Sequence, residues 1–324
     1  MDSALRQSKP RCVWAIDLGG THTKLGLVDE AGRALAHETF PTRSPRGGDS
    51  WADEAASTLR TIADEAGLAE DAILAVGLGA PGPLSVKRGL LLNPLPNLPG
   101  WQGFPITAAL RDRPGKPAFL DNDANVAALA EHWVGVGRGV DNLIVLTLGT
   151  GIGSGVIADG RLLHGFSDNA GELGHLSINY RGPKCVCGNR GCIELYASGP
   201  ALVRLFKRNL KGRESTLKDR ADITPRLIHQ AAKAGDAVAR ESLLAVGRYL
   251  GLAIASMVHA FNPELVVLAG GLAGASDFLL GPAREVVRER TYPDLQAGLR
   301  LEASSLGPIA GLLGAARLAL LSQD

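Results

Sequence analysis

One order of elements occurs twice along this chain, and the repeat limits the folds that the chain can adopt. Residues 13–18 and 24–28 read as two strands around a Gly-Gly-Thr turn, and residues 143–148 and 156–157 read the same way around Gly-Thr-Gly. In both copies an aspartate, a glycine and an arginine follow the second strand. The repeat is weak in residue identity. It nevertheless predicts two related α/β domains that face each other, each presenting a glycine hairpin to a shared cleft.

Apolar runs and helical spacing predict the remaining elements. The other strands expected are one that ends near residue 40, 73–78, a short one within 114–120, one after Arg161, 265–268 and 299–301. The helices expected are 51–66, 122–134, 198–210, 224–234, 237–260, 282–290 and 308–321. Gly311 and Gly314 lie in the last helix, and we expect that helix to pack closely against another element.

The bulk composition narrows the class of protein. A chain of 324 residues, 45% of them hydrophobic, is long enough for two domains. The formal net charge of +1 gives no electrostatic reason to expect a nucleic-acid or membrane partner. No apolar run reaches membrane-spanning length, and the first eleven residues are polar and charged without an apolar signal core. We therefore expect a soluble cytoplasmic protein.

The cysteines indicate a metal site. Three of the four crowd together near one histidine, and this grouping argues against a disulfide scaffold in a chain of this length. One imidazole and three thiolates within 18 residues form a full ligand set for a closed tetrahedral zinc site. These four residues are His175, Cys185, Cys187 and Cys192. The remaining Cys12 precedes an apolar run and is expected to be a buried free thiol.

Three glycine loops follow strands and could bind phosphate. Glycines let backbone N–H groups point at an anion without obstruction from a Cβ. The candidate residues are Gly19, Gly20, Thr21, Thr23 and Lys24 in the first loop, Thr150, Gly151 and Gly153 in the second, and Gly270 and Gly271 in the third. Taken alone, the first loop is more typical of an ordinary hairpin, and it has neither the Walker spacing nor a dinucleotide fingerprint. Three such loops together favour a nucleotide, with two on the phosphates and one against the nucleoside.

Acidic side chains stand at two strand ends. Asp17 either holds a magnesium-bound water or caps its turn, and the sequence supports both equally. Residues 121–125 read Asp-Asn-Asp-Ala-Asn, where an N-cap cluster explains one or two polar residues but not four in five. The N-terminus of a helix favours an ionised Asp123, which could accept a hydroxyl proton during phosphoryl transfer.

Further polar residues could orient the other hydroxyls of a polyol. A polar ligand needs several fixed donors and acceptors, because each mismatched hydroxyl leaves a buried group unpaired. The candidates are Asn122, Glu172, His175 and Glu194. For Glu172 and Glu194, support of the zinc ligands is an open alternative.

Six motifs resemble those of one family and occur in that family's order. They are residues 17–21 (DLGGT), 79–83 (GAPGP), 122–125 (NDAN), 149–153 (GTGIG), 171–175 (GELGH) and 185–194 (CVCGNRGCIE). The chain resembles the ROK (repressor/ORF/kinase) family of bacterial sugar kinases from about residue 13 to 315, and most of all its glucokinases. The combined zinc and Asn-Asp-Ala-Asn motifs are highly specific.

The resemblance implies an actin-like, ribonuclease-H-like ATPase fold with two α/β domains, divided as residues 1–121 plus 309–324 and residues 122–308. It implies that Asp123 is the general base that takes the proton of the sugar's 6-hydroxyl. It implies sugar contacts from Asn122, Glu172, His175 and Glu194, and structural zinc on His175, Cys185, Cys187 and Cys192. ATP with Mg²⁺ is the implied donor, and a homodimer is expected from family habit alone.

Alternatives to a glucose kinase remain. The acceptor could be N-acetylmannosamine, N-acetylglucosamine, mannose or fructose, and the donor could be ADP or polyphosphate. A sugar-sensing regulator that binds without turnover is opposed by Asp123 and the three glycine loops. About a dozen residues precede the first strand, too few for the helix-turn-helix of the family's repressors. A zinc-knuckle nucleic-acid module is opposed by the near-neutral charge.

Overall fold

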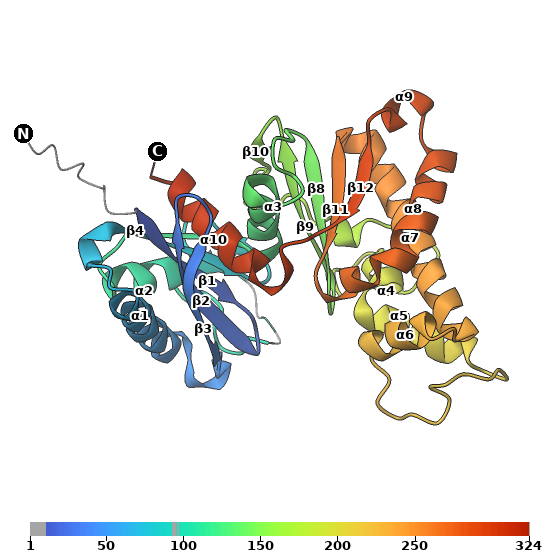
Figure 1. The fold of residues 1–324 in the computed structure, drawn as a ribbon, viewed down its shortest axis with the longest axis horizontal. Coiled ribbons are helices and arrows are strands. Elements are labelled where there is room, and N and C mark those ends of the chain that lie inside the picture. Colours follow the sequence, from blue (N-terminus) through green and yellow to red (C-terminus); the bar gives the residue numbers. More distant parts are fainter. Residues whose placement is uncertain (1–10, 93–94, 96, 324) are drawn as a thin grey trace, which may run out of the picture. The chain divides into compact units, whose positions relative to one another are not determined.

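The structure of the protein, a computed structural model, describes residues 11–92, 95 and 97–323 (Figure 1). The chain divides into two compact units. The first consists of Met1–Val134, His164–Asn169 and Ile309–Asp324, and the second of Gly135–Leu163 and Ala170–Pro308. The domain division expected from the sequence, at residues 121/122 and 308/309, stays a prediction. Residues 1–10, on which the expectation of no signal segment mostly depended, lie outside the described residues.

The first unit is built on a five-stranded sheet in the order β3-β2-β1-β4-β7. The strands are β1 (Cys12–Leu18), β2 (His22–Asp29), β3 (Ala34–Pro41), β4 (Ile73–Ala80) and β7 (Ala118–Asn122). β2 pairs antiparallel with β1 and β3, whereas β1, β4 and β7 run parallel. β1 and β4 are buried almost throughout. Parallel strands covered on both faces read as continuous apolar runs, which is why these two were predictable.

Helices cover both faces of this sheet (Figure 1). They are α1 (Gly48–Glu65), α2 (Ile106–Asp112), α3 (Asp123–Val134) and α10 (Ala310–Leu321). α1 and α2 share one core cluster with alternate residues of β1 and β4, while α10 packs on α3, β4 and β1. A Cβ on Gly314 would overlap the backbone of Val126 in α3, and one on Gly77 would overlap that of Ala315. The close packing expected of the last helix is confirmed.

The second unit repeats this topology. Its sheet has the order β10-β9-β8-β11-β12, with β8 (Leu143–Leu148), β9 (Ile152–Ala158), β10 (Arg161–Leu162), β11 (Leu265–Ala269) and β12 (Arg300–Ala303). β9 pairs antiparallel with β8 and β10, and β11 pairs parallel with β8 and β12. The hairpin repeat seen in the sequence is therefore a repeat of the whole five-stranded sheet.

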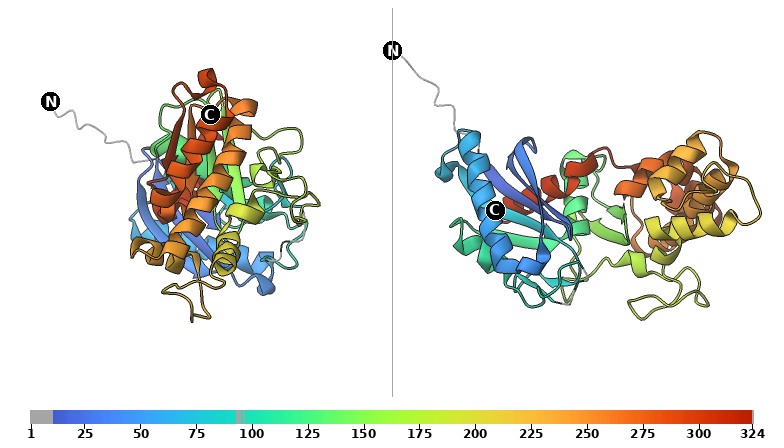
Figure 2. Two further views of the ribbon diagram at one scale, coloured as in Figure 1. Left: turned by 90° about the vertical axis from the view of Figure 1, so that its right-hand side faces the viewer. Right: turned by 90° about the horizontal axis from the view of Figure 1, so that it is seen from below.

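Helices make up most of the rest of the second unit. They are α4 (Glu194–Ala197), α5 (Gly199–Asn209), α6 (Pro225–Lys233), α7 (Ala237–Phe261), α8 (Ser276–Arg290) and α9 (Pro293–Gln296). Ser198, Thr224 and Asp236 cap α5, α6 and α7 by accepting a hydrogen bond from a backbone N–H of the first turn. α7 and α8 run side by side (Figure 2).

The structure corrects the sequence reading at three places. α8 begins at Ser276 rather than at Pro282, because its contact with Gly247 and Gly251 of α7 outweighs the helix-breaking tendency of an internal proline. Short elements were missed, namely the helices α2, α4 and α9 and the two-residue strands β5 (Leu84–Ser85) and β6 (Leu90–Leu91). α7 has 25 residues, and its most apolar window has a mean hydropathy of 1.5, so by length and composition alone it could span a membrane. The expectation that no apolar run is that long is therefore wrong. α7 is apolar because it is a core helix, with 56% of its most apolar window buried.

Candidate functional site

The carboxyl ends of three parallel strands gather the acidic residues of the first unit. Asp17 of β1 is the register partner of Gly79 in β4, and Gly79 is the partner of Asp121 in β7. Asn122 ends β7, and Asp123 begins α3. In open α/β sheets ligands bind at this edge. The structure therefore brings the predicted residues at 17 and at 122–123 to one edge of one sheet.

Asp17 lies between a cation and the start of a helix. Lys24 is its cross-strand partner, and the Lys24 Nζ donates to Asp17 Oδ2 at 3.2 Å. A Cβ on Gly311, in the first turn of α10, would lie 2.7 Å from Asp17 Cγ. The partial positive charge of a helix N-terminus favours a nearby carboxylate. Asp17 thus forms a charged contact at the hairpin, and its predicted part in magnesium binding stays a prediction.

The first glycine hairpin is held from inside the unit. Gly19 N–H donates to His22 O at 3.0 Å across the turn, and Thr42 Oγ1 donates to Gly19 O at 2.6 Å. Thr23 is fully buried, and its hydroxyl accepts from Trp51 Nε1 at 2.9 Å. Gly20 and Thr21 form the turn itself. Thr23 therefore supports this hairpin through a buried side-chain contact with α1. The nucleotide contacts predicted for the loop stay a prediction.

At the β7–α3 junction the polar cluster of residues 121–125 was interpreted either as a helix N-cap or as a proton acceptor, and the two interpretations apply to different residues. Asn122 caps α3, since its Oδ1 accepts from Ala124 N at 2.9 Å, and its Nδ2 donates to Gly82 O at 3.4 Å. Asp123 is the first residue of the helix and is exposed. Its Oδ1 also accepts from Ala124 N, at 2.8 Å. Capping therefore accounts for Asn122, whereas Asp123 presents an exposed carboxylate at the positive end of α3.

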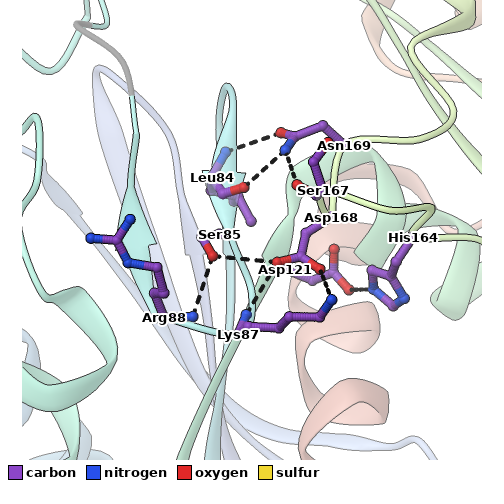
Figure 3. A network of polar contacts seen from close by, with 9 residues as sticks. All are labelled: Leu84, Ser85, Lys87, Arg88, Asp121, His164, Ser167, Asp168 and Asn169. Atoms are coloured by element: carbon purple, nitrogen blue, oxygen red, sulfur yellow. Dashed lines mark hydrogen bonds and ion pairs between the residues drawn. The ribbon is translucent and has the colours of Figure 1, made fainter.

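The sequence reading missed the part played by Asp121. This carboxylate is 0% exposed, and it accepts hydrogen bonds from Asn122 N and Asn125 Nδ2, both at 2.7 Å. Its other oxygen lies 2.6 Å from His164 Nε2 (Figure 3). His164 is 43 residues away in the sequence, so no local spacing could have revealed the pair.

In the second unit the two remaining glycine loops lie at the corresponding edge. Gly149 N–H donates to Gly151 O at 2.9 Å to close the β8–β9 turn that contains Thr150. Gly270 follows β11 with a φ of 81°, and a Cβ there would lie 2.7 Å from Leu148 O at the end of β8. The predicted nucleotide residues Thr150, Gly151, Gly153, Gly270 and Gly271 are thus gathered at the ends of two neighbouring strands.

Glu194 lies against this hairpin. Its Oε2 accepts from Ile152 N at 3.2 Å, and a Cβ on Gly151 would overlap the same carboxylate. Glu194 was predicted to bind sugar and Gly151 to bind nucleotide. The contact shows that one carboxylate and one glycine of the second unit share a small space, which sequence spacing did not indicate.

The four predicted metal ligands converge. One ligand atom from each of them lies within 4.8 Å of the others. Cys187 Sγ and Cys192 Sγ are 3.7 Å apart, and Cys185 Sγ is 3.6 Å from His175 Nδ1. A tetrahedral zinc with Zn–S bonds of about 2.3 Å places two sulfurs about 3.8 Å apart. The cluster has the ligand types and spacing of a closed zinc site.

The chemistry of the donors also fits a cation. Burial raises the pKa of the Cys192 thiol to about 12, and a bound cation would favour the thiolate there. Because His175 Nδ1 faces the thiols, its Nε2 is directed elsewhere and lies 4.0 Å from Glu172 Oε2. His175 therefore has one ring nitrogen for a metal and the other for a second partner.

Comparisons with known proteins agree with this arrangement. A family model described as the ROK family matches residues 13–321. The glucokinase of Thermotoga maritima is 38% identical over 308 residues, which are 94% of this chain and 95% of that protein. The crystal structure of the ROK hexokinase from Thermus thermophilus is similar with a TM-score of 0.80 and 38% identity, over 96% of this chain and 99% of that one. A ROK family glucokinase from Streptomyces griseus, solved in complex with glucose and AMPPNP, is similar with a TM-score of 0.80 and 33% identity, over 96% and 99%.

Proposed function

This chain belongs to the ROK family, and on that premise we propose that it transfers the terminal phosphoryl group of ATP to the 6-hydroxyl of glucose. It is a sugar kinase with the actin-like ATPase fold. The observation that carries the proposed chemistry is the position of Asp123, exposed at the first residue of α3 and at the carboxyl edge of its sheet.

Asp123 is proposed as the general base. Its carboxylate accepts the proton of the 6-hydroxyl as that oxygen attacks the terminal phosphorus of ATP. The bond between this phosphorus and the bridging oxygen breaks, and ADP leaves with that oxygen. Phosphoryl transfer needs positioning and charge neutralisation more than a strong base. An ordinary carboxylate held at a helix N-terminus is sufficient for this role.

The glycine hairpins of both units are proposed to bind ATP. The residues are Gly19, Gly20, Thr21, Thr23 and Lys24 in the first unit and Thr150, Gly151, Gly153, Gly270 and Gly271 in the second. Backbone N–H groups at such turns stabilise phosphate oxygens. Mg²⁺ bound to ATP would neutralise charge on the phosphates, and Asp17 is the residue proposed to hold it, through water.

Asn122, Glu172, His175 and Glu194 are proposed to bind the sugar. Zinc on His175, Cys185, Cys187 and Cys192 would fix the orientation of the His175 ring, so that Nε2 meets a sugar hydroxyl. The metal is structural in this proposal and takes part in no chemical step.

The remaining expectations accompany this proposal. A division into domains at residues 121/122 and 308/309, a homodimer and a cytoplasmic location are carried forward from the sequence reading. Light scattering coupled to size exclusion would measure the oligomeric state, and a monomer at micromolar concentration would contradict the dimer.

The proposed activity is tested by a coupled ADP-release assay on a panel of sugars. Glucose is compared with mannose, fructose, N-acetylglucosamine and N-acetylmannosamine, first with ATP and then with ADP or polyphosphate as donor. We expect the highest kcat/KM for glucose with ATP and a product phosphorylated at oxygen 6 by ³¹P NMR. A higher kcat/KM for an N-acetylhexosamine would show that this sugar, and not glucose, is the preferred substrate. Sugar binding by calorimetry without turnover would show that the protein is a sugar sensor and not a kinase.

A further inference from the structure

The carboxylate of Asp121 forms a buried anchor beside the proposed base. In the described part of the chain three groups bind it. Asn122 N and Asn125 Nδ2 each lie 2.7 Å from one oxygen. His164 Nε2 lies 2.6 Å from the other oxygen, a contact that Figure 3 shows. Asp121 is 0% exposed. A carboxylate removed from water in this way needs both hydrogen bonds and a compensating charge. Of the three surrounding groups, only the imidazole of His164 can carry a positive charge.

His164 reaches this position on a short segment of chain, residues 164–169. The segment belongs to the first unit, although the residues before and after it, Leu163 and Ala170, belong to the second. Two further side chains attach the segment to β5 of the first unit. Asn169 Oδ1 accepts from Leu84 N at 3.3 Å and its Nδ2 donates to Leu84 O at 3.2 Å, like a paired strand residue (Figure 3).

Asp168 forms the other attachment. It is buried, with a φ of 65°, and its Oδ2 accepts from Ser85 Oγ and from Lys87 N, both at 3.3 Å. A non-glycine residue in the left-handed region is strained, so this geometry persists because its hydrogen bonds hold it. With both attachments in place, the segment fixes where the His164 ring can lie.

The charges that face His164 favour its cationic form. The hydrogen bond to Asp121 raises the pKa of His164 and outweighs the opposing effect of burial. The charge of Asp168 acts in the same direction, while Lys87 acts against it. The imidazolium form therefore persists to higher pH than for an ordinary histidine.

We propose that His164, as an imidazolium bound to Asp121, is a positioning residue for phosphoryl transfer. The inference rests on the proposed function, because it concerns the placement of Asp123. Asp121 accepts a hydrogen bond from the backbone N–H of Asn122. Asn122 in turn caps α3, whose first residue is Asp123. If His164 loses its charge, the buried carboxylate loses its counter-ion and the β7–α3 junction relaxes. A displacement of a reacting group by about 1 Å can cost about 10²-fold in rate.

The proposal predicts a pH dependence with a definite sign. His164 has a pKa raised above its unfolded value, so the ion pair is complete below about pH 6.5 and is lost as pH rises through the raised value. The kcat for sugar phosphorylation should therefore decrease on the alkaline side.

The test compares His164→Gln with His37→Gln, a matched change of an exposed histidine on β3 of the same unit. We expect His164→Gln to lower kcat at least tenfold, to leave KM for ATP within twofold, and to remove the alkaline decrease. The His37 variant should match the wild type. The double variant His164→Gln/Asp121→Asn, which restores a neutral hydrogen-bonded pair, should recover part of the loss.

A second readout does not depend on turnover. The ring nitrogens of His164 are titrated by ¹H–¹⁵N NMR in the wild type and in Asp121→Asn, where the His164 pKa should fall toward that of an ordinary histidine. An unchanged His164 pKa in Asp121→Asn would overturn this inference and leave the proposed function intact. A His164→Gln variant with wild-type kcat and pH profile would do the same. A wild type that phosphorylates no sugar would overturn the proposed function and this inference with it.

Discussion

The two sheets share one strand order but carry different groups at their hairpins. In the first unit Asp17 is paired across the hairpin with Lys24, and in the second unit Thr147 is paired with Gly153. Each turn is closed by one backbone hydrogen bond, from Gly19 N to His22 O at 3.0 Å in the first and from Gly149 N to Gly151 O at 2.9 Å in the second. Because the scaffold is the same, the fold does not require the ion pair of the first hairpin. We infer that the ion pair serves the chemistry of the first unit.

The ends of the third parallel strands differ in the same way. Asp123 follows β7 in the first unit, and Ser304 follows β12 in the second. We expect Asp123→Asn to lower kcat by about 10³-fold, because a proton acceptor is lost. Ser304→Ala should stay within about twofold. Steady-state kinetics measure both, and circular dichroism checks the fold. A comparable loss in both variants would contradict a special role for the first unit.

The two hairpins can be compared directly. Asp17→Asn removes the charge that faces Lys24 and α10, and kcat with MgATP should decrease by about 10²-fold. Thr147→Val, at the equivalent position, should cost about threefold or less. Rates measured over a range of magnesium concentrations test the reason, since Asp17→Asn should need more magnesium. An equal decrease of kcat in the two variants would contradict a special role for the ion pair of the first hairpin.

Structural zinc is expected in the second unit, where its four candidate ligands converge. Cys187→Ser should lose stoichiometric zinc and weaken glucose binding at least about tenfold, since the ring of His175 is no longer held. Cys12→Ala, which alters a buried thiol of β1 far from the zinc ligands in sequence, should keep both. Atomic absorption and calorimetry are the measurements. Unchanged glucose affinity in zinc-depleted Cys187→Ser would contradict the proposal that zinc supports glucose binding.

The smallest effect concerns stability. Asp29 after the first hairpin is buried and accepts from Ala31 N, Arg33 N and Arg33 Nε, whereas Asp159 after the second is exposed. Asp29→Ala should cost about 1–2 kcal/mol of unfolding free energy at pH 7, and Asp159→Ala about 0.5 kcal/mol or less.

The pH dependence of that cost has a definite sign. Burial acts to raise the pKa of Asp29, but the hydrogen bonds from Arg33 and Ala31 prevail and lower it. The stabilisation is therefore present above the unfolded pKa of about 3.9 and is lost as pH falls through the folded value. Urea denaturation of both variants at pH 7 and pH 3 checks this. A cost of Asp29→Ala that is equal at both pH values would refute the charge argument.

Local patterns in the sequence account for what could be predicted. The inner strands are apolar runs closed by glycines, and the metal ligands lie close together in sequence, so both follow from short windows. α2 was missed because seven residues give too little periodicity. The start of α8 was missed because Pro282 resembles a first-turn proline, and only contact with α7 reveals otherwise.

Contacts between distant segments account for what could not be predicted. His164 meets Asp121 across 43 residues, and Glu194 meets Ile152 across 42. Neither pair has a spacing that distinguishes it from any other histidine or glutamate near a polar residue. Such pairs become visible only when the sheet edges are assembled.

The position of α10 has a consequence for synthesis. The first unit needs residues 309–324, and α10 packs against β1, β4 and α3, all made some 175 residues or more earlier. On the ribosome the second unit has all its residues before the first unit is complete. We expect nascent chains stalled before residue 309 to leave the first unit open to protease while the second resists, and equal protection of both would refute this order.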